Sequence, residues 1–217
     1  MNKYKLSFIL ILIWGGVFSY AAISDTEIMS EHKLVKAVMS EKNSDLADLL
    51  SKGGDPNFVD NEGKSLLILS IEQNNLDAYK TLLEAGAEPN YRNIKAEKRA
   101  RQVVMELAAV HPEPQYLKYA LQYGGDPNSK ESYGNRNIIF EAVRSSRLEN
   151  VKTLVTANAN LNVTDKNRNT PLHEAVAVAN FDIVYFLIKQ GASLQSKDKW
   201  GYSPLDLINK YQDRGIK

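Results

Sequence analysis

The sequence predicts an all-α solenoid, in which repeats of two helices joined by a turn stack along one axis. The clearest repeat is residues 165–195, where Thr170 is a good helix N-cap, Pro171 suits the first helical position and Gly191 suits a helix C-terminus. Five segments end in related tags, such as GGDPN at residues 53–57, and the last residues of successive tags are 33, 38, 34 and 33 positions apart. One such unit cannot bury its apolar faces alone, so the recurrence predicts a stack of neighbours.

The motif residues resemble the ankyrin-repeat family. Thr170-Pro171-Leu172-His173 matches the T-P-L-H that opens the first helix of an ankyrin repeat, and the family period is about 33 residues. The resemblance covers residues 27–212 and implies an ankyrin-repeat solenoid with short β-turn fingers, five repeats and a C-terminal half-repeat cap. The repeats are expected at about 27–57, 60–90, 91–128, 131–162 and 165–195, with the cap at 198–217.

The first two repeats show the expected apolar stripes. In residues 27–57 the polar Asn43 stands where the family usually has leucine, which fits the polar outer face of a terminal repeat. In residues 60–90, Asp60-x-x-Gly63 matches the projecting turn, and Ser65 stands at the position of the motif threonine.

The third repeat, residues 91–128, is five residues longer than its neighbours. Aligning Ala108-Ala109 with the usual alanine pair puts the excess before the first helix, in a segment with five basic residues and one acid, YRNIKAEKRAR at 91–101. This basic insertion is either a solvated loop or an extended helix start, or else a docking finger for an acidic partner surface. Residues 111–114, HPEP, break the helix between the two halves of the repeat.

The last repeats depart from the pattern in two turns. Tyr133-Gly134 lies in a turn that reads one residue longer than usual. Arg168 replaces a turn glycine, which is expected to cost stability if the left-handed backbone is kept. Asp198-x-x-Gly201 then begins a unit with room for one helix only, so it caps the stack.

The N-terminus predicts export. Lys3 and Lys5 precede an apolar run at 6–17, and Ser19 and Ala21 place small residues at a cleavage site, so residues 1–21 read as a signal peptide and 22–217 as the mature ankyrin domain. An uncleaved anchor is the alternative, because the apolar segment is nearly long enough to cross a bilayer. A periplasmic location is expected, with secretion or inner-membrane anchoring as alternatives.

The composition argues against several classes of function. There is no cysteine, which excludes disulfides, thiol catalysis and zinc–thiolate sites. Removing residues 1–21 takes away two of 27 basic residues and none of the 26 acidic ones, so the mature charge of −1 gives no case for nucleic acid.

No catalytic motif is present in the sequence. His32, His111 and His173 lie in different repeats without metal-ligand spacing, and the ankyrin resemblance implies that His173 braces its turn by hydrogen bonding. There is no G-x-S-x-G, phosphate-binding glycine loop or H-E-x-x-H. We therefore expect no enzyme, no cofactor and no metal.

Repeat stacks bind partners through the projecting turns and the adjacent helix face. The residues expected to contact a partner are Asn61, Glu62, Lys64, Arg92, Lys95, Arg99, Tyr133, Arg136, Arg144, Lys166, Asn167, Asn169, Lys199, Trp200 and Tyr202. Tyr133, Trp200 and Tyr202 stand out, because folding does not require aromatics at turn tips and Tyr, Trp and Arg dominate interface hot spots. The alternative is that Trp200 and Tyr202 cover the core of the last repeat.

The resemblance and the export signal together imply a protein-binding function. An exported ankyrin chain is similar to periplasmic immunity proteins that bind and inhibit antibacterial effectors, such as phospholipase toxins. The alternatives are a secreted host-directed binder and a periplasmic scaffold or stress-associated partner of the cell's own enzymes. In each case we expect a monomer when free, no nucleic acid, and no membrane contact unless the N-terminal segment is an uncleaved anchor.

Overall fold

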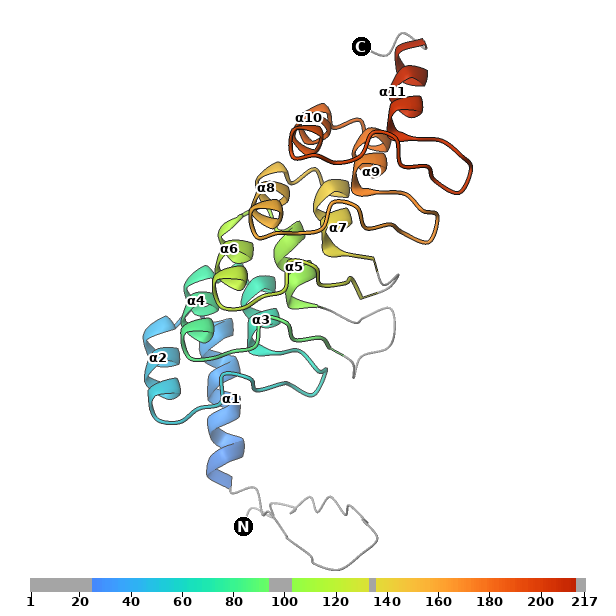
Figure 1. Cartoon of the computed structure of the whole chain (residues 1–217). Helices are drawn as coiled ribbons and strands as arrows, with labels where there is room; N and C mark the ends of the chain where they lie inside the picture. The colour runs from blue at the N-terminus through green and yellow to red at the C-terminus, as the bar shows by residue number, and fades with distance from the viewer. Residues whose placement is uncertain (1–24, 94–102, 133–135, 214–217) are drawn as a thin grey trace, which may run out of the picture.

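Eleven helices stack in two rows in the computed structural model, which describes residues 25–93, 103–132 and 136–213 (Figure 1). The inner row contains α1 (Asp25–Met39), α3 (Leu66–Glu72), α5 (Val104–Val110), α7 (Ile138–Arg144), α9 (Pro171–Ala177) and α11 (Pro204–Asp213). The outer row contains α2 (Asn43–Ser51), α4 (Leu76–Glu84), α6 (Gln115–Gln122), α8 (Leu148–Thr156) and α10 (Phe181–Lys189). The predicted all-α ankyrin solenoid is confirmed.

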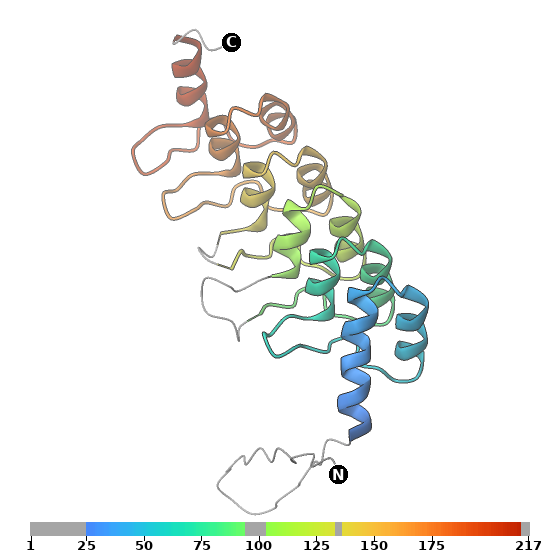
Figure 2. The same ribbon diagram turned by 180° about the vertical axis from the view of Figure 1, so that it is seen from behind.

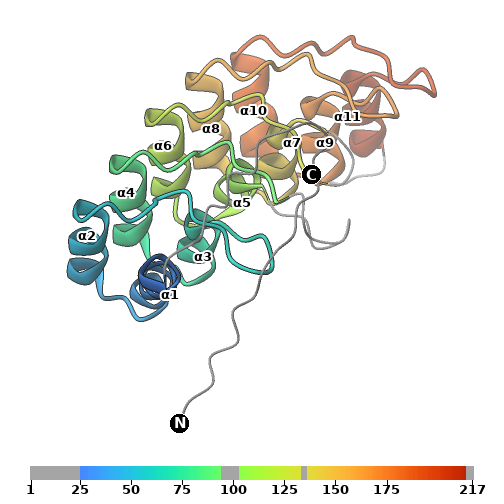
Figure 3. The same ribbon diagram turned by 90° about the horizontal axis from the view of Figure 1, so that it is seen from below.

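Both rows run the length of the molecule, with α1 and α11 at opposite ends (Figure 3). Helices α3, α5, α7 and α9 each pack on an outer partner and on the inner helices before and after them, so the core is a continuous layer between the rows. The described parts of the fingers between repeats project to one side, which is seen again from behind (Figure 2). None of the described helices has the length and hydropathy of a membrane span. The predicted signal peptide, residues 1–21, lies outside the described residues.

The boundaries of α9 follow from the motif that predicted them. Thr170 caps the helix by accepting a hydrogen bond from the backbone N–H of His173, and Pro171 is the first helical residue. His173 Nδ1 accepts the backbone N–H of Thr170 (3.0 Å), and Nε2 lies 3.2 Å from the carbonyl oxygen of Tyr202 in the next unit. The predicted bracing role of His173 is therefore confirmed, and it extends across the repeat boundary.

The recurring tag has a structural cause. The side-chain amide of Asn90 donates to the carbonyl of Gly124 (2.9 Å), and its oxygen accepts the backbone N–H of Asp126 (2.8 Å), both in the following tag. Asn57 and Asn128 make the same pair of bonds to the next tag along the chain. The asparagine at the end of a tag thus ties one repeat to the next, which is why it returns at the repeat spacing.

The fingers carry the length differences between repeats. Antiparallel bridges close three described finger bases, at Val59–Ser65, Arg92–Val103 and Lys130–Asn137. These pairs enclose five, ten and six residues, respectively. The five-residue excess of the third repeat therefore lies within its finger, before α5, and the turn of the fourth repeat is one residue longer, as predicted.

Arg168 keeps the backbone of the glycine that it replaces. Its φ is 61°, compared with 81° at Gly63 and 85° at Gly201 in the equivalent turns. A residue with a β-carbon is disfavoured in this left-handed region. We expect Arg168→Gly to raise the free energy of unfolding by about 0.5–1 kcal/mol, measured by urea denaturation. Arg168→Ala is the control, since it removes the side chain but keeps the β-carbon; an equal gain in both variants would assign the effect to the arginine side chain.

Two buried tyrosines meet where the second and third repeats pack together. The rings of Tyr79 and Tyr116 lie edge to face, with centroids 5.1 Å apart, and both side chains are buried. Within the described residues neither hydroxyl has a hydrogen-bond partner, and burial raises the pKa of Tyr116 to about 12.

A buried hydroxyl without a partner loses its hydration and gains no bond in return. Tyr79→Phe is therefore expected to leave stability unchanged or to raise it by up to about 1 kcal/mol, as measured by thermal or urea unfolding. A loss of more than that amount would show that the hydroxyl has a partner, such as an enclosed water molecule.

Candidate charged hollow on the finger side

A hollow of about 800 Å³ lies between helices α5, α7 and α9 and the described parts of the fingers of the fourth and fifth repeats. Its lining is almost entirely charged or amide side chains: Glu106, Glu131, Arg136, Glu141, Arg144, Asp165, Lys166, Asn167, Asn169 and Glu174. Among the described residues, the lining has five carboxylates and three cationic groups, which gives this part of the lining a formal charge of −2. The volume is within the usual range for ligand pockets, but those are mostly apolar, so this hollow suits a polar occupant.

Arg136 lines the hollow and pairs with three of its carboxylates. Its guanidinium forms a close ion pair with Glu141, and its nitrogens lie 3.5 Å from an oxygen of Glu131 and 4.0 Å from an oxygen of Glu174. It also lies over the ring of buried Phe140, at 5.5 Å from the centroid. The side chain of Arg136 is only 14% exposed, so this cation is already enclosed by carboxylates from two repeats.

Arg144 joins the same network from the end of α7. Its Nε donates to Glu174 Oε1 (2.9 Å), and its Nη1 lies 3.5 Å from Glu141 Oε2. Glu141 and Glu174 occupy corresponding positions one repeat apart, on α7 and α9. The two arginines therefore link Glu141 on α7 to Glu174 on α9.

Burial perturbs the acids of the hollow. Desolvation raises the pKa of Glu141 and of Glu174, although the nearby Arg136 favours their ionised forms. Desolvation also raises the pKa of Glu106, against the opposing effect of its bond to Ser132. Keeping these groups ionised costs free energy, and such perturbed acids gather at functional sites more often than elsewhere.

Sequence reasoning missed Glu106. Residues 103–106, VVME, align with T-P-L-H, so Glu106 stands at the position of His173. Its Oε2 accepts the backbone N–H of Ser132 (2.9 Å) in the next finger, just as His173 contacts the finger after its own repeat. Aligning the repeats with one another places Glu106 at the histidine position. A carboxylate there was not expected to bond to the next finger as the histidine does.

The structure gathers only part of the predicted partner-contact set around the hollow. Five of the predicted residues line it: Arg136, Arg144, Lys166, Asn167 and Asn169. Lys64 instead pairs with Glu72 (3.0 Å) and Glu62 (3.7 Å) within the second repeat, where Asn61 also lies on the exposed finger. Lys95, Arg99 and Tyr133 lie outside the described residues.

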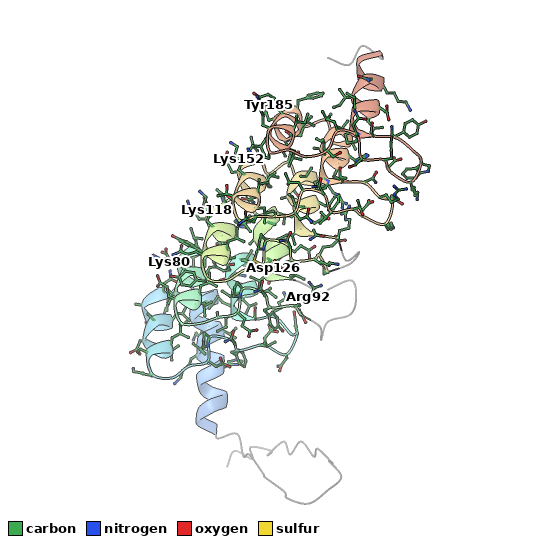
Figure 4. All side chains as sticks on the ribbon, viewed as in Figure 1. Lys80, Arg92, Lys118, Asp126, Lys152 and Tyr185 are labelled. Atoms are coloured by element: carbon green, nitrogen blue, oxygen red, sulfur yellow. The ribbon has the colours of Figure 1, made fainter. Side chains whose placement is uncertain are left out.

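Arg92 has a structural role that the sequence did not indicate. Its guanidinium donates to the carbonyls of Lys130 (2.6 Å) and Glu131 (3.2 Å), so it ties the third finger to the fourth. It lies on the finger side, whereas Lys80, Lys118 and Lys152 lie on the outer helices (Figure 4). Because Glu131 lines the hollow, this bond from Arg92 helps to fix that part of the lining.

The finger of the cap carries two exposed aromatic side chains. Trp200 is 61% exposed and Tyr202 48%, so the core of the last repeat does not enclose them. Lys199 Nζ lies 4.3 Å from the centroid of the Trp200 ring and bonds to Asn167 Oδ1, while its backbone N–H donates to the carbonyl of Asn167. This contact places the aromatic finger beside the wall of the hollow. Nowhere in the described part of the chain do three or more His, Asp or Glu side chains gather closely enough to hold a metal ion.

The stacked helix pairs, projecting fingers and inter-repeat asparagines define an ankyrin-repeat solenoid. Residues 104–198 match the family model described as ankyrin repeats (3 copies). An ankyrin repeat domain from Acinetobacter baumannii AYE superposes with a TM-score of 0.75 at 28% identity, covering 86% of this chain and 94% of that one. The human ASB11 ankyrin repeat domain superposes with a TM-score of 0.66 at 22% identity, covering 85% and 84%. Residues 104–198 therefore carry ankyrin repeats, and the described residues fold as an ankyrin-repeat solenoid similar to the domains on which they superpose.

Two curated relatives show how widely such repeats are used. The ankyrin repeat protein FPV230 of Fowlpox virus (strain NVSL) is 29% identical over 178 residues, or 81% of this chain and 91% of the relative. The tyrosine-protein kinase Shark of Drosophila melanogaster is 31% identical over 147 residues, or 67% of this chain. The chain spans 15% of the length of Shark and 21% of that of ZDHHC13 of Danio rerio, another match.

Proposed function

We propose that this chain is an exported protein-binding module, and that it acts as a periplasmic immunity protein that inhibits a cognate antibacterial effector. The observation that carries the binding function is the charged hollow. The turns and caps of the repeats do not require the partly buried carboxylates Glu141 and Glu174 on one face, and ankyrin repeats commonly bind proteins on their finger side.

The finger face is organised before any partner arrives. The hydroxyl of Tyr91 donates to the carbonyl of Gly63 (2.7 Å), which ties the third finger to the second. Arg92 and Lys199 make the corresponding ties further along the stack. A surface held in this way loses little conformational entropy on association, which favours tight inhibition.

The immunity role is supported by the export signal together with the fold. The basic residues Lys3 and Lys5, the apolar run at 6–17 and the small residues before Ala22 are the pattern of a secretory signal. A rigid binding module in the periplasm can protect a cell by plugging the active site of an incoming toxin, such as a phospholipase.

The test is co-expression of the full chain, which carries a C-terminal affinity tag, with a lipase-type effector whose gene neighbours its own in the genome. We expect survival of the cells and a stoichiometric complex on affinity purification. A complex without protection would favour the scaffold alternative, and neither complex nor protection would overturn the immunity role. Mass spectrometry of the recovered chain tests export: cleavage before Ala22 is expected, and an intact N-terminus in the membrane fraction would indicate an anchor.

A further inference from the structure

We infer that the charged hollow receives a lysine or arginine side chain from an exposed segment of the partner protein. This inference rests on the proposed binding function and names the chemistry that the partner must present. It is specific to the third to fifth repeats, where the hollow lies.

The first argument is charge complementarity. The lining carries an excess of two carboxylates, and its most enclosed acids, Glu131, Glu141 and Glu174, have side chains only 9%, 13% and 17% exposed. Coulomb interactions are stronger at such partly buried positions than at the open surface. A cation entering the hollow would offset the desolvation that raises the pKa of Glu141 and Glu174.

The second argument is the supply of hydrogen-bond acceptors. An ionised carboxylate has about four acceptor positions. Glu174 meets Arg144 at 2.9 Å through one oxygen, and within the described part of the chain its other oxygen makes the longer 4.0 Å approach to Arg136. The carboxylate of Glu174 can therefore still accept hydrogen bonds from a guanidinium or an ammonium group that enters the hollow.

The third argument concerns what the hollow would reject. Both arginines of the hollow are already paired: Glu131, Glu141 and Glu174 surround Arg136, and Glu141 and Glu174 also pair with Arg144. An incoming carboxylate or phosphate would meet these acids at close range, and like charges at close range repel. The geometry thus selects a basic segment over an acidic one.

The exposed aromatic finger completes the surface. Asn167 lines the hollow and also bonds to Lys199, so Trp200 stands next to the hollow. The long aliphatic stem of a lysine or arginine packs well on an aromatic ring while its charged end reaches polar groups. Trp200 is placed to hold the backbone or stem of the segment that inserts the basic side chain.

The test uses the purified full-length chain and two fluorescein-labelled peptides, octa-arginine and octaglutamate, in fluorescence anisotropy titrations at low salt. We expect saturable binding of octa-arginine and none of octaglutamate. The double variant Glu141→Gln/Glu174→Gln should weaken octa-arginine binding by about tenfold or more, because two carboxylates of the hollow are neutralised. The matched control is Glu84→Gln/Glu149→Gln, which makes the same charge change on the outer helices; it should alter the affinity by less than about twofold.

Equal weakening in both double variants, or tighter binding of octaglutamate, would overturn the inference. Thermal melts of each variant separate a loss of binding from a loss of fold, and Trp200→Ala provides a second probe at an exposed position. If the effector binds the chain but the hollow variant retains its affinity, the inference fails while the proposed function stands. If octa-arginine binding depends on the hollow but no effector is bound, the preference for a basic segment stands and the immunity role fails.

Discussion

Phe140→Ala is expected to lower the free energy of unfolding by about 3–5 kcal/mol, because it opens a cavity in the middle of the solenoid. Phe140 is fully buried on α7 and occupies the motif histidine position of the fourth repeat. Its ring also supports Arg136. We therefore expect the variant to loosen the hollow as well as the core, which urea denaturation and anisotropy with octa-arginine would measure separately.

The control for Phe140 is Phe181→Ala. Phe181 begins α10 and is 52% exposed, so its loss should cost less than about 1 kcal/mol. In a solenoid each repeat contacts only its neighbours, so damage to the fourth repeat can also uncouple the two ends of the stack. A broadened or two-step transition in Phe140→Ala would show such uncoupling, and equal losses in both variants would contradict the cavity argument.

Asn150→Ala is expected to cost about 2–3 kcal/mol, because it leaves buried carbonyls without their donor. Asn150 is 1% exposed, and its side-chain amide donates to the carbonyls of Ala109 (2.8 Å) and His111 (2.9 Å) in the preceding repeat. These bonds hold the turn at which the prolines interrupt the helix. Loss of the amide therefore weakens the contact between the third and fourth repeats.

The matched control for Asn150 is Asn61→Ala, at an exposed finger position, where a change of less than about 0.5 kcal/mol is expected. Both variants are measured by urea unfolding at the same pH. Equal stabilities would mean that the carbonyls of Ala109 and His111 find other donors, such as water, once the amide is removed.

The elements that could be predicted from the sequence are those fixed by local rules. A few neighbouring residues decide three such features: the cap at Thr170, the start of α9 at Pro171, and the left-handed backbone of Gly191 after α10. The extra length of the third repeat was also placed correctly, because the spacing of tags and alanine pairs leaves no other position for it.

The hollow could not be predicted, because it depends on contacts between repeats. Its central ion pairs join Arg136 to Glu131, Glu141 and Glu174, and the positions of these side chains follow only once the repeats are stacked. Arg136 was predicted to contact a partner, but the repeat pattern does not reveal these ion pairs. Arg92 illustrates the same limit, since the sequence did not indicate that its guanidinium donates to the carbonyls of Lys130 and Glu131 in the next finger.

The bridge between Arg92 and Val103 marks a position at which a foreign peptide can be inserted into this chain. The bridge closes the base of a finger that holds ten residues, where the Val59–Ser65 pair holds five. Since the stack is held by the helices and by the tag asparagines, the number of residues between the bridged positions can change without altering the register of the repeats. A binding peptide or a reporter sequence grafted after Asn93, which is buried and donates to the carbonyl of Glu62, and before Val103 offers a route to engineered recognition that leaves the solenoid intact.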